Sequence, residues 1–113
     1  MSREAGYSAE QLAADFLSQR GFQLIERNFT VKGGEIDLVC DDGGTLVFVE
    51  VRARKSSDFG APEETITSAK RRRIVLAAKL YLLTKQIEER ACRFDVIAID
   101  GDQITHIPDA FSA

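Results

Sequence analysis

A chain of 113 residues, 44% hydrophobic and 29% charged, has the size and composition of one soluble globular domain, which we place at residues 1–113. A domain of this length folds without a disulfide or a structural metal, and its two cysteines lack the spacing of a zinc site. A formal net charge of -3 excludes a uniformly basic nucleic-acid-binding protein.

The cysteines and the apolar runs predict where the protein works. Cys40 and Cys92 both lie in apolar, strand-like runs, so we expect two buried free thiols, as in a reducing compartment. The chain has no charged-then-apolar leader, and its apolar runs are too short to span a bilayer. We therefore expect a cytoplasmic protein without a membrane partner.

The first elements are a helix and a strand. Residues 3–20 carry apolar side chains at helical spacing, and Gly21 is suited to end that helix. Ser8 and Gln11 have capping-box spacing, although the good helix formers before them leave the start open. Residues 22–30 predict a strand, and residues 32–34 a turn.

The central stretch predicts two antiparallel strands, residues 34–39 and 46–52, joined by the four-residue turn Asp41-Asp42-Gly43-Gly44. If Cys40 faces Thr45 across the turn, the alternate side chains divide between two faces. One face carries Glu35, Asp37, Val39, Leu46, Phe48, Glu50 and Arg52. The other, almost wholly apolar, carries Ile36, Leu38, Cys40, Thr45, Val47, Val49 and Val51. Because both faces are apolar near the turn, we expect a helix to cover each of them.

This pairing brings acidic side chains together at the open end of the hairpin. Asp37 and Glu50 become diagonal neighbours, roughly 6–8 Å apart at their origins. Two carboxylates at that separation suit one hard cation, such as Mg²⁺, which binds oxygen at about 2.1 Å. A slip of one residue would move Glu50 to the opposite face and remove the site.

The second half predicts a loop, a helix and two strands. Residues 53–64 lack periodicity, and the helix at residues 66–86 follows. The stripe expected to face the core is Ile74, Ala77, Ala78, Tyr81 and Leu82, with Lys70 one turn earlier on the same side. Residues 93–99 predict a strand and residues 103–107 an edge strand ended by Pro108, on which His106 would lie at the surface.

Basic side chains gather near the acidic group. Seven of the fifteen basic residues lie in one window: Arg52, Arg54, Lys55, Lys70, Arg71, Arg72 and Arg73. Such a local patch is what binding to phosphates requires. For Lys70 the inward direction favours a functional role, whereas for Arg72 and Arg73 a solvated helix face fits equally well.

Two carboxylates with a cation beside them suit phosphodiester hydrolysis. Asp37 and Glu50 would hold magnesium, with the backbone carbonyl of Val51 as a further ligand, and the metal would lower the pKa of a bound water. The cationic side chain of Arg52 would stabilise negative charge that develops in the transition state.

At these residues the chain resembles a known pattern. Asp37 followed by Glu50-Val51-Arg52 resembles the PD-(D/E)xK nuclease signature, and more specifically the bacterial YraN family, which is related in fold to Holliday-junction resolvases. The segments that carry the resemblance are Gly6 and Glu10, Arg27-Asn28, residues 34–38, residues 48–52 with Arg54, Lys70, Tyr81-Leu82 and residues 93–95.

The resemblance implies a restriction-endonuclease-like three-layer α/β/α fold, with a mixed five-stranded sheet and a helix on each face, acting on DNA with Mg²⁺ or Mn²⁺. It makes Asp37 and Glu50 metal ligands, Glu10 a further acidic residue at the site and Lys70 a phosphate contact. The wider pattern has lysine at Arg52, and arginine cannot accept a proton from water, although it can still balance negative charge. Lysines migrate within this superfamily, so Lys55 or Lys70 could reach the site from elsewhere.

Three hypotheses remain open at this point. The first is a magnesium-dependent nuclease acting on DNA, with branched or single-stranded DNA as candidate substrates; a twofold dimer would suit a symmetric substrate. The second is a nucleic-acid-binding domain of the same fold that has lost or weakened the chemistry. The third is a structural protein in which arginines neutralise Glu35, Asp37 and Glu50, so that no metal binds.

Overall fold

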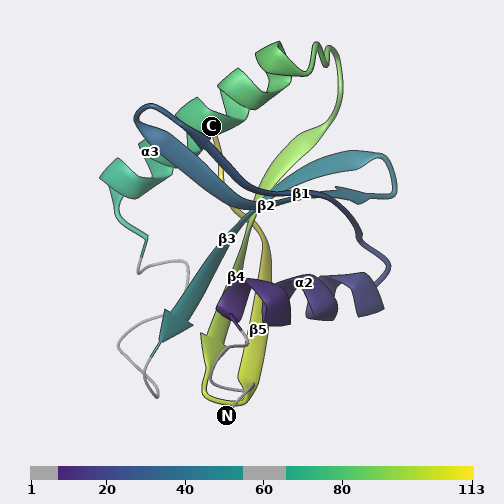
Figure 1. Cartoon of the computed structure of the whole chain (residues 1–113), viewed down its shortest axis with the longest axis vertical. Coiled ribbons are helices and arrows are strands. Elements are labelled where there is room, and N and C mark those ends of the chain that lie inside the picture. Colours follow the sequence, from purple (N-terminus) through teal and green to yellow (C-terminus); the bar gives the residue numbers. More distant parts are fainter. Residues whose placement is uncertain (1–7, 55–65) are drawn as a thin grey trace.

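The computed structural model describes residues 8–54 and 66–113. In chain order the elements are α2 (Ala9–Gln19), β1 (Gln23–Val31), β2 (Gly34–Asp42), β3 (Thr45–Arg54), α3 (Ser68–Thr84), β4 (Cys92–Asp100) and β5 (Gln103–Phe111). The strands form one five-stranded sheet in the order β1-β2-β3-β4-β5, in which only β3 and β4 run parallel. Figure 1 shows α2 and α3 on opposite sides of this strongly twisted sheet. The predicted α/β class and mixed sheet are confirmed.

The ends of α2 follow from local capping chemistry. The Ser8 hydroxyl accepts a hydrogen bond from the Gln11 N–H at 3.0 Å, which satisfies a donor of the first helical turn. Gly21 has a φ of 93°, and the next residue, Phe22, donates its N–H to the Leu17 carbonyl at 3.0 Å. The capping residue and the stop are confirmed, while residues 1–7 lie outside the described residues.

The central hairpin has a tighter turn than predicted. Gly43 and Gly44 alone form it, with φ values of 60° and 102°, and Cys40 pairs with Val47 instead of Thr45. Two successive glycines supply both positive φ values of a two-residue turn whose twist matches the strands. The register therefore differs by two residues from the prediction, and a shift of two leaves each side chain on its own face.

One side chain of the hairpin departs from the predicted alternation. Ile36 packs in the α3 cluster, although Leu38 lies against α2. In the neighbouring strand Asn28 has a positive φ of 52°, and the β1–β2 ladder skips the step between Arg27–Leu38 and Phe29–Ile36. This irregularity breaks the two-residue period, so the ends of both strands turn toward α3.

Two apolar clusters fill the space between the sheet and its helices. The buried residues on the α3 side are Ile36, Val39, Leu46, Phe48, Ile66, Ile74, Ala77, Ala78, Tyr81, Phe94, Val96 and Phe111. Those on the α2 side are Ala13, Ala14, Leu17, Leu38, Cys40, Val47, Val49, Ile97 and Ile99. The predicted stripe of α3 is confirmed, with Leu82 only partly buried at its margin.

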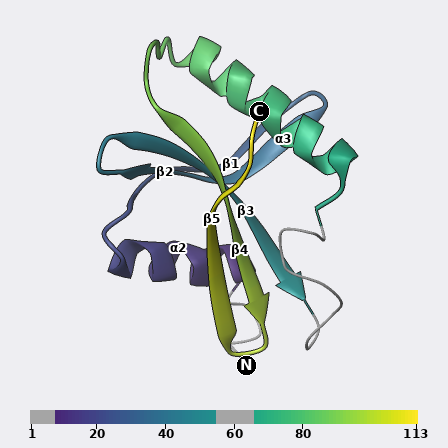
Figure 2. The same cartoon turned by 180° about the vertical axis from the view of Figure 1, so that it is seen from behind.

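The C-terminal strand is longer than predicted. β5 continues through Pro108 to Phe111, whose ring stacks on that of Phe94 with centroids 5.0 Å apart. Asp109 has a φ of 53° and donates its N–H to the Asp95 carboxylate at 2.9 Å, so a bulge absorbs the proline. Figure 2 shows the end of β5 running up to α3.

The two cysteines have different environments. Cys40 is buried as predicted, and burial raises the pKa of its thiol to about 12. Cys92, at the first position of β4, is exposed, so the prediction of a second buried thiol is wrong. None of the helices in residues 8–54 and 66–113 is long and apolar enough to cross a membrane.

Candidate active site

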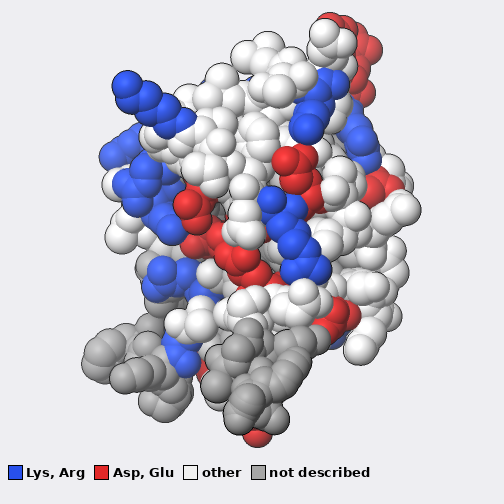
Figure 3. Space-filling view, viewed as in Figure 1, with Lys and Arg blue, Asp and Glu red and all other residues white. Residues whose placement is uncertain are grey.

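A pocket of about 420 Å³ lies where the open end of the hairpin meets the first turns of both helices. Its lining residues are Ser8, Ala9, Glu10, Asp37, Glu50, Val51, Arg52, Ala53 and Lys70. Figure 3 shows acidic side chains gathered in the middle of one face of the molecule, with basic side chains on either side. Strand pairing and helix packing thus bring together residues that are far apart in the sequence.

Asp37 and Glu50 face each other across the hairpin. The ladder ends at the pair Leu38–Val49; its register, continued by one step, sets Asp37 opposite Glu50, and the two carboxyl groups interact. The Asp37 side chain accepts a hydrogen bond from the Val51 N–H at 2.8 Å. This contact ties the carboxylate to the next strand at the point where regular pairing stops.

Asp37 has a strongly perturbed acidity. Its pKa is raised from 3.8 to about 7: burial is the largest cause and the negative charge of Glu50 adds to it, whereas the hydrogen bond from the Val51 N–H acts in the opposite direction. A carboxyl group of this kind holds a proton near neutral pH unless a cation compensates its charge.

Only one of the two carboxylate oxygens of Glu50 has a recorded polar partner among the described residues. Its side chain is 4% exposed, and its Oε2 lies 3.3 Å from Nζ of Lys70 on α3. Its Oε1 is buried without a hydrogen-bond partner among the described residues. An unpaired buried carboxylate oxygen is costly, and a divalent cation bound beside Asp37 would compensate it. The donor set at these two residues therefore fits Mg²⁺ or Mn²⁺.

Glu10 lies in the pocket from the α2 side. Burial raises its pKa, as does the charge of Asp37, whereas a hydrogen bond with Asn28 lowers it. Within residues 8–54 and 66–113, however, no three His, Cys, Asp or Glu side chains converge as a metal-binding group. An ion at Asp37 and Glu50 would therefore need backbone or water oxygens as well, and the assignment of Glu10 as a ligand stays a prediction.

Arg52 follows Glu50 by two residues on β3 and lines the same pocket. Its Nε is buried and has no hydrogen-bond partner in the described part of the chain. A buried N–H of a guanidinium that lacks an acceptor is suited to donate a hydrogen bond to an anionic ligand. Its predicted catalytic role stays a prediction, but its position beside the two carboxylates agrees with it.

The other basic residues of the predicted patch have unequal environments. Arg54 forms a two-point ion pair with Asp100, at 2.8 and 2.9 Å, which favours a structural role. Arg71 donates to the Ile66 carbonyl at 3.1 Å and lies over the Phe111 ring. Arg72 and Arg73 are exposed, as is Glu35, and Lys55 lies outside the described residues.

Comparison with known proteins settles the family. The family model described as "Uncharacterised protein family UPF0102" matches residues 9–99. This chain belongs to the UPF0102 family. A UPF0102 protein of Dechloromonas aromatica is 56% identical over 108 residues, covering 96% of this chain and 88% of that protein. A UPF0102 protein of Symbiobacterium thermophilum is 47% identical over 100 residues, covering 88% of this chain and 85% of that protein. One of Hahella chejuensis is 48% identical over 114 residues, covering 98% of this chain and 92% of that protein.

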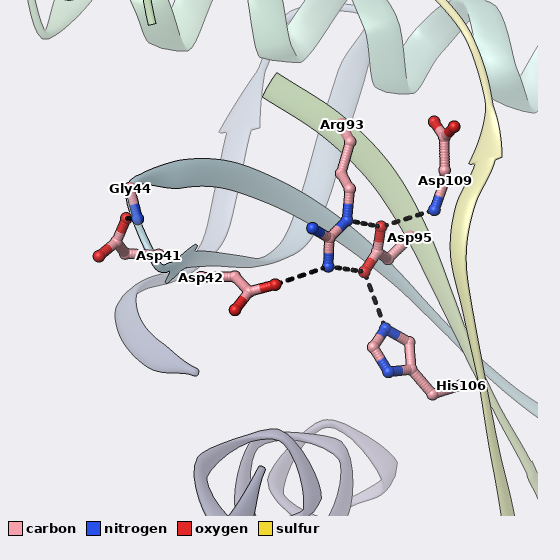
Figure 4. Close-up of polar contacts among 7 residues, drawn as sticks. All are labelled: Asp41, Asp42, Gly44, Arg93, Asp95, His106 and Asp109. Atoms are coloured by element: carbon pink, nitrogen blue, oxygen red, sulfur yellow. Dashed lines mark hydrogen bonds and ion pairs between the residues drawn. The ribbon is translucent and has the colours of Figure 1, made fainter. Parts of the chain in front are cut away.

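The UPF0102 chain contains a second polar centre, which the sequence analysis missed (Figure 4). Asp95 is 0% exposed, and its carboxylate accepts hydrogen bonds from Arg93 at 2.9 and 3.1 Å and lies 2.8 Å from Nε2 of His106. Arg93 also lies 3.0 Å from Asp42, next to the hairpin turn. Burial would raise the pKa of Asp95, but the hydrogen bonds from His106, Arg93 and the Asp109 N–H outweigh it and lower the pKa.

The place of His106 on an edge strand predicted a surface residue, and this prediction is wrong. Its side chain is 8% exposed, and its ring packs against the edges of Phe16 and Phe22. The available signal was an aspartate inside an apolar strand, since a fully buried acid needs several partners. Because Asp95 is sealed from solvent and satisfied, this centre joins β4 to β5 and the hairpin and offers no site for a reactant.

Proposed function

We propose that this UPF0102 protein is a metal-dependent nuclease of the PD-(D/E)xK type that hydrolyses phosphodiester bonds in DNA, including branched or single-stranded DNA. The observation that carries the proposal is the opposition of Asp37 and Glu50, with the buried Oε1 of Glu50 unpaired among the described residues. A cation is the natural complement of two such carboxylates.

In this proposal the residues that line the pocket have different roles. Asp37, Glu50 and the Val51 carbonyl would hold Mg²⁺ or Mn²⁺, and that ion would polarise the phosphate and lower the pKa of a water. The guanidinium of Arg52 would hold the phosphate and balance its growing negative charge. Lys70, 3.3 Å from Glu50, would orient that carboxylate and meet the phosphate from the α3 side.

A second candidate function is DNA binding without hydrolysis. It is favoured by Arg52, because arginine stays protonated and cannot take a proton from water as a lysine can. In this alternative the pocket would still bind a cation and a phosphate, but bound DNA would remain uncut.

Incubation of labelled single-stranded, duplex and four-way-junction DNA with Mg²⁺ or Mn²⁺ tests the proposal. We expect cutting by the natural chain and a loss of about 100-fold or more in Glu50→Gln, because a neutral amide holds the cation poorly. Asp102→Asn, in the exposed β4–β5 turn, is the matched control and should cut normally.

Cutting that survives Glu50→Gln would come from elsewhere and would contradict the proposal. DNA retained but uncut under all conditions would support the second candidate instead. Arg52→Lys separates the two further: cleavage that appears only in this variant would show that arginine is what prevents hydrolysis.

A further inference from the structure

A second hollow adjoins the acidic pocket along α3. It has a volume of about 310 Å³ and is lined by Thr30, Val31, Gly34, Glu35, Lys70, Arg73 and Ile74. Lys70 lines both hollows, so they meet at its side chain. A ligand held at Asp37 and Glu50 could therefore extend past Lys70 toward the start of β2.

The three consecutive arginines of α3 point to three different surroundings. Arg71 is engaged with the Ile66 carbonyl and the Phe111 ring. Arg72 lines a mainly apolar hollow on another part of the helix, together with Leu76 and the C-terminal residues. Arg73 alone among them lines the hollow next to the acidic pocket.

Arg73 is also available for a ligand. It is exposed and forms no ion pair with any residue in the ranges 8–54 and 66–113. It follows Lys70 by three positions, so the two side chains are neighbours on the helix surface. Glu35 is exposed and is the one acidic residue among those that line this hollow, beside the two cationic side chains of Lys70 and Arg73.

We propose that the hollow at Arg73 binds the phosphate next to the one held at Asp37 and Glu50, so that one nucleic-acid strand passes along α3 from Lys70 to Arg73. The inference rests on the proposed function and names the path of its substrate. Arginine presents a planar fork that matches phosphate oxygens. A volume of about 310 Å³ is at the lower end of small-ligand pockets, which suits a nucleotide of a single strand.

Binding of a short fluorescent single-stranded DNA, followed by anisotropy, tests this path. It is measured in Ca²⁺, a cation with the same preference for oxygen, and in EDTA, across a range of salt concentrations. We expect Arg73→Ala to weaken binding about five- to tenfold and to reduce the salt slope by about 0.7, the loss of one phosphate contact to a single strand. The matched variant Arg72→Ala should bind within about twofold of the natural chain.

The outcomes separate this inference from the proposed function. If the natural chain binds DNA and both variants weaken it equally, or Arg72→Ala weakens it more, the path along Arg73 is wrong and the nuclease proposal stands. If the natural chain binds no DNA under either condition, both fail. Because Arg72 and Arg73 are exposed, urea unfolding should show equal stability for the two variants, which excludes misfolding as the cause.

Discussion

Asp37 and Glu50 are two carboxylates that face each other where water hardly reaches. Asp37 is 7% exposed and Glu50 3%, and between them the described residues supply one ammonium group and one backbone N–H. Such an arrangement is destabilising unless a proton or a cation neutralises it. The two buried carboxylates therefore lower the stability of the folded chain, and such perturbed groups are typical of functional sites.

This loss of stability predicts a pH dependence. Because the pKa of Asp37 is raised from 3.8 to about 7, the folded chain keeps a proton that the unfolded chain releases. Ionisation of Asp37 thus opposes folding above pH 7, and this penalty fades as the pH falls toward 4. We expect Asp37→Asn to increase the free energy of unfolding by about 2 kcal/mol at pH 8 without divalent cations, and by much less at pH 4.5.

Urea unfolding at the two pH values measures the effect, with Asp102→Asn as a control that should change stability by less than about 0.5 kcal/mol. Asparagine keeps the shape of the side chain and can still accept the Val51 N–H, so the charge is the main difference. An equal increase in the free energy of unfolding at pH 8 and pH 4.5 would show that the negative charge of Asp37 does not destabilise the folded chain.

At the scale of elements, the contact between β2 and α3 positions the site. A Cβ placed on Gly34 would overlap the carbonyl oxygen of Arg73, so the helix backbone lies directly on the strand. The same approach brings Lys70 to Glu50 and Arg73 to the neighbouring hollow. Only glycine permits this distance.

Gly34→Ala should therefore lower the free energy of unfolding by about 2–3 kcal/mol, because neither backbone can move freely. The control is Gly43→Asn in the hairpin turn, where nothing lies within 4 Å of the added Cβ and asparagine tolerates the φ of 60°. Urea unfolding of both variants compares them. If both variants lost a similar amount of unfolding free energy, the close packing against α3 would not be what requires glycine at position 34.

Elements governed by neighbouring residues were predictable from the sequence. The Ser8 cap, the Gly21 stop and the apolar stripe of α3 were all confirmed, because capping and periodicity depend on residues within a few positions. The continuation of β5 beyond Pro108 was not predictable, because the bulge that absorbs the proline depends on Asp95 in the neighbouring strand.

At the scale of the whole molecule, the site joins both helical layers to the sheet. Glu10 lies in the first turn of α2 and Lys70 in the first turn of α3, and Asp37 and Glu50 belong to the strands between them. A ligand bound there would contact all three layers. Its binding free energy would consequently add to the stability of the folded chain.

We therefore expect Mg²⁺ or Mn²⁺ to raise the thermal midpoint of unfolding, with about 2.7 kcal/mol of stabilisation at a cation concentration 100 times the dissociation constant. The shift should be larger at pH 8 than at pH 6, because Asp37 must lose its proton to bind the cation. Scanning calorimetry with NaCl of matched ionic strength as the control measures it.

Glu50→Gln should abolish that shift while Asp102→Asn retains it. An equal rise in the natural chain and in Glu50→Gln would place the cation elsewhere. The absence of any rise in the natural chain would support the hypothesis of a structural protein, in which Lys70 and the buried surroundings alone hold Glu50.

The sequence alone determined the order of the elements and, apart from Ile36, the two apolar faces of the central hairpin, because these depend on local periodicity and parity. Only the tertiary structure decided that Asp37 and Glu50 line one pocket, that Arg73 and not Arg72 lines the hollow next to that pocket, and that Asp95 and His106 form a sealed centre. These features depend on the turn length and on contacts between distant elements, which a pattern of neighbouring residues does not encode.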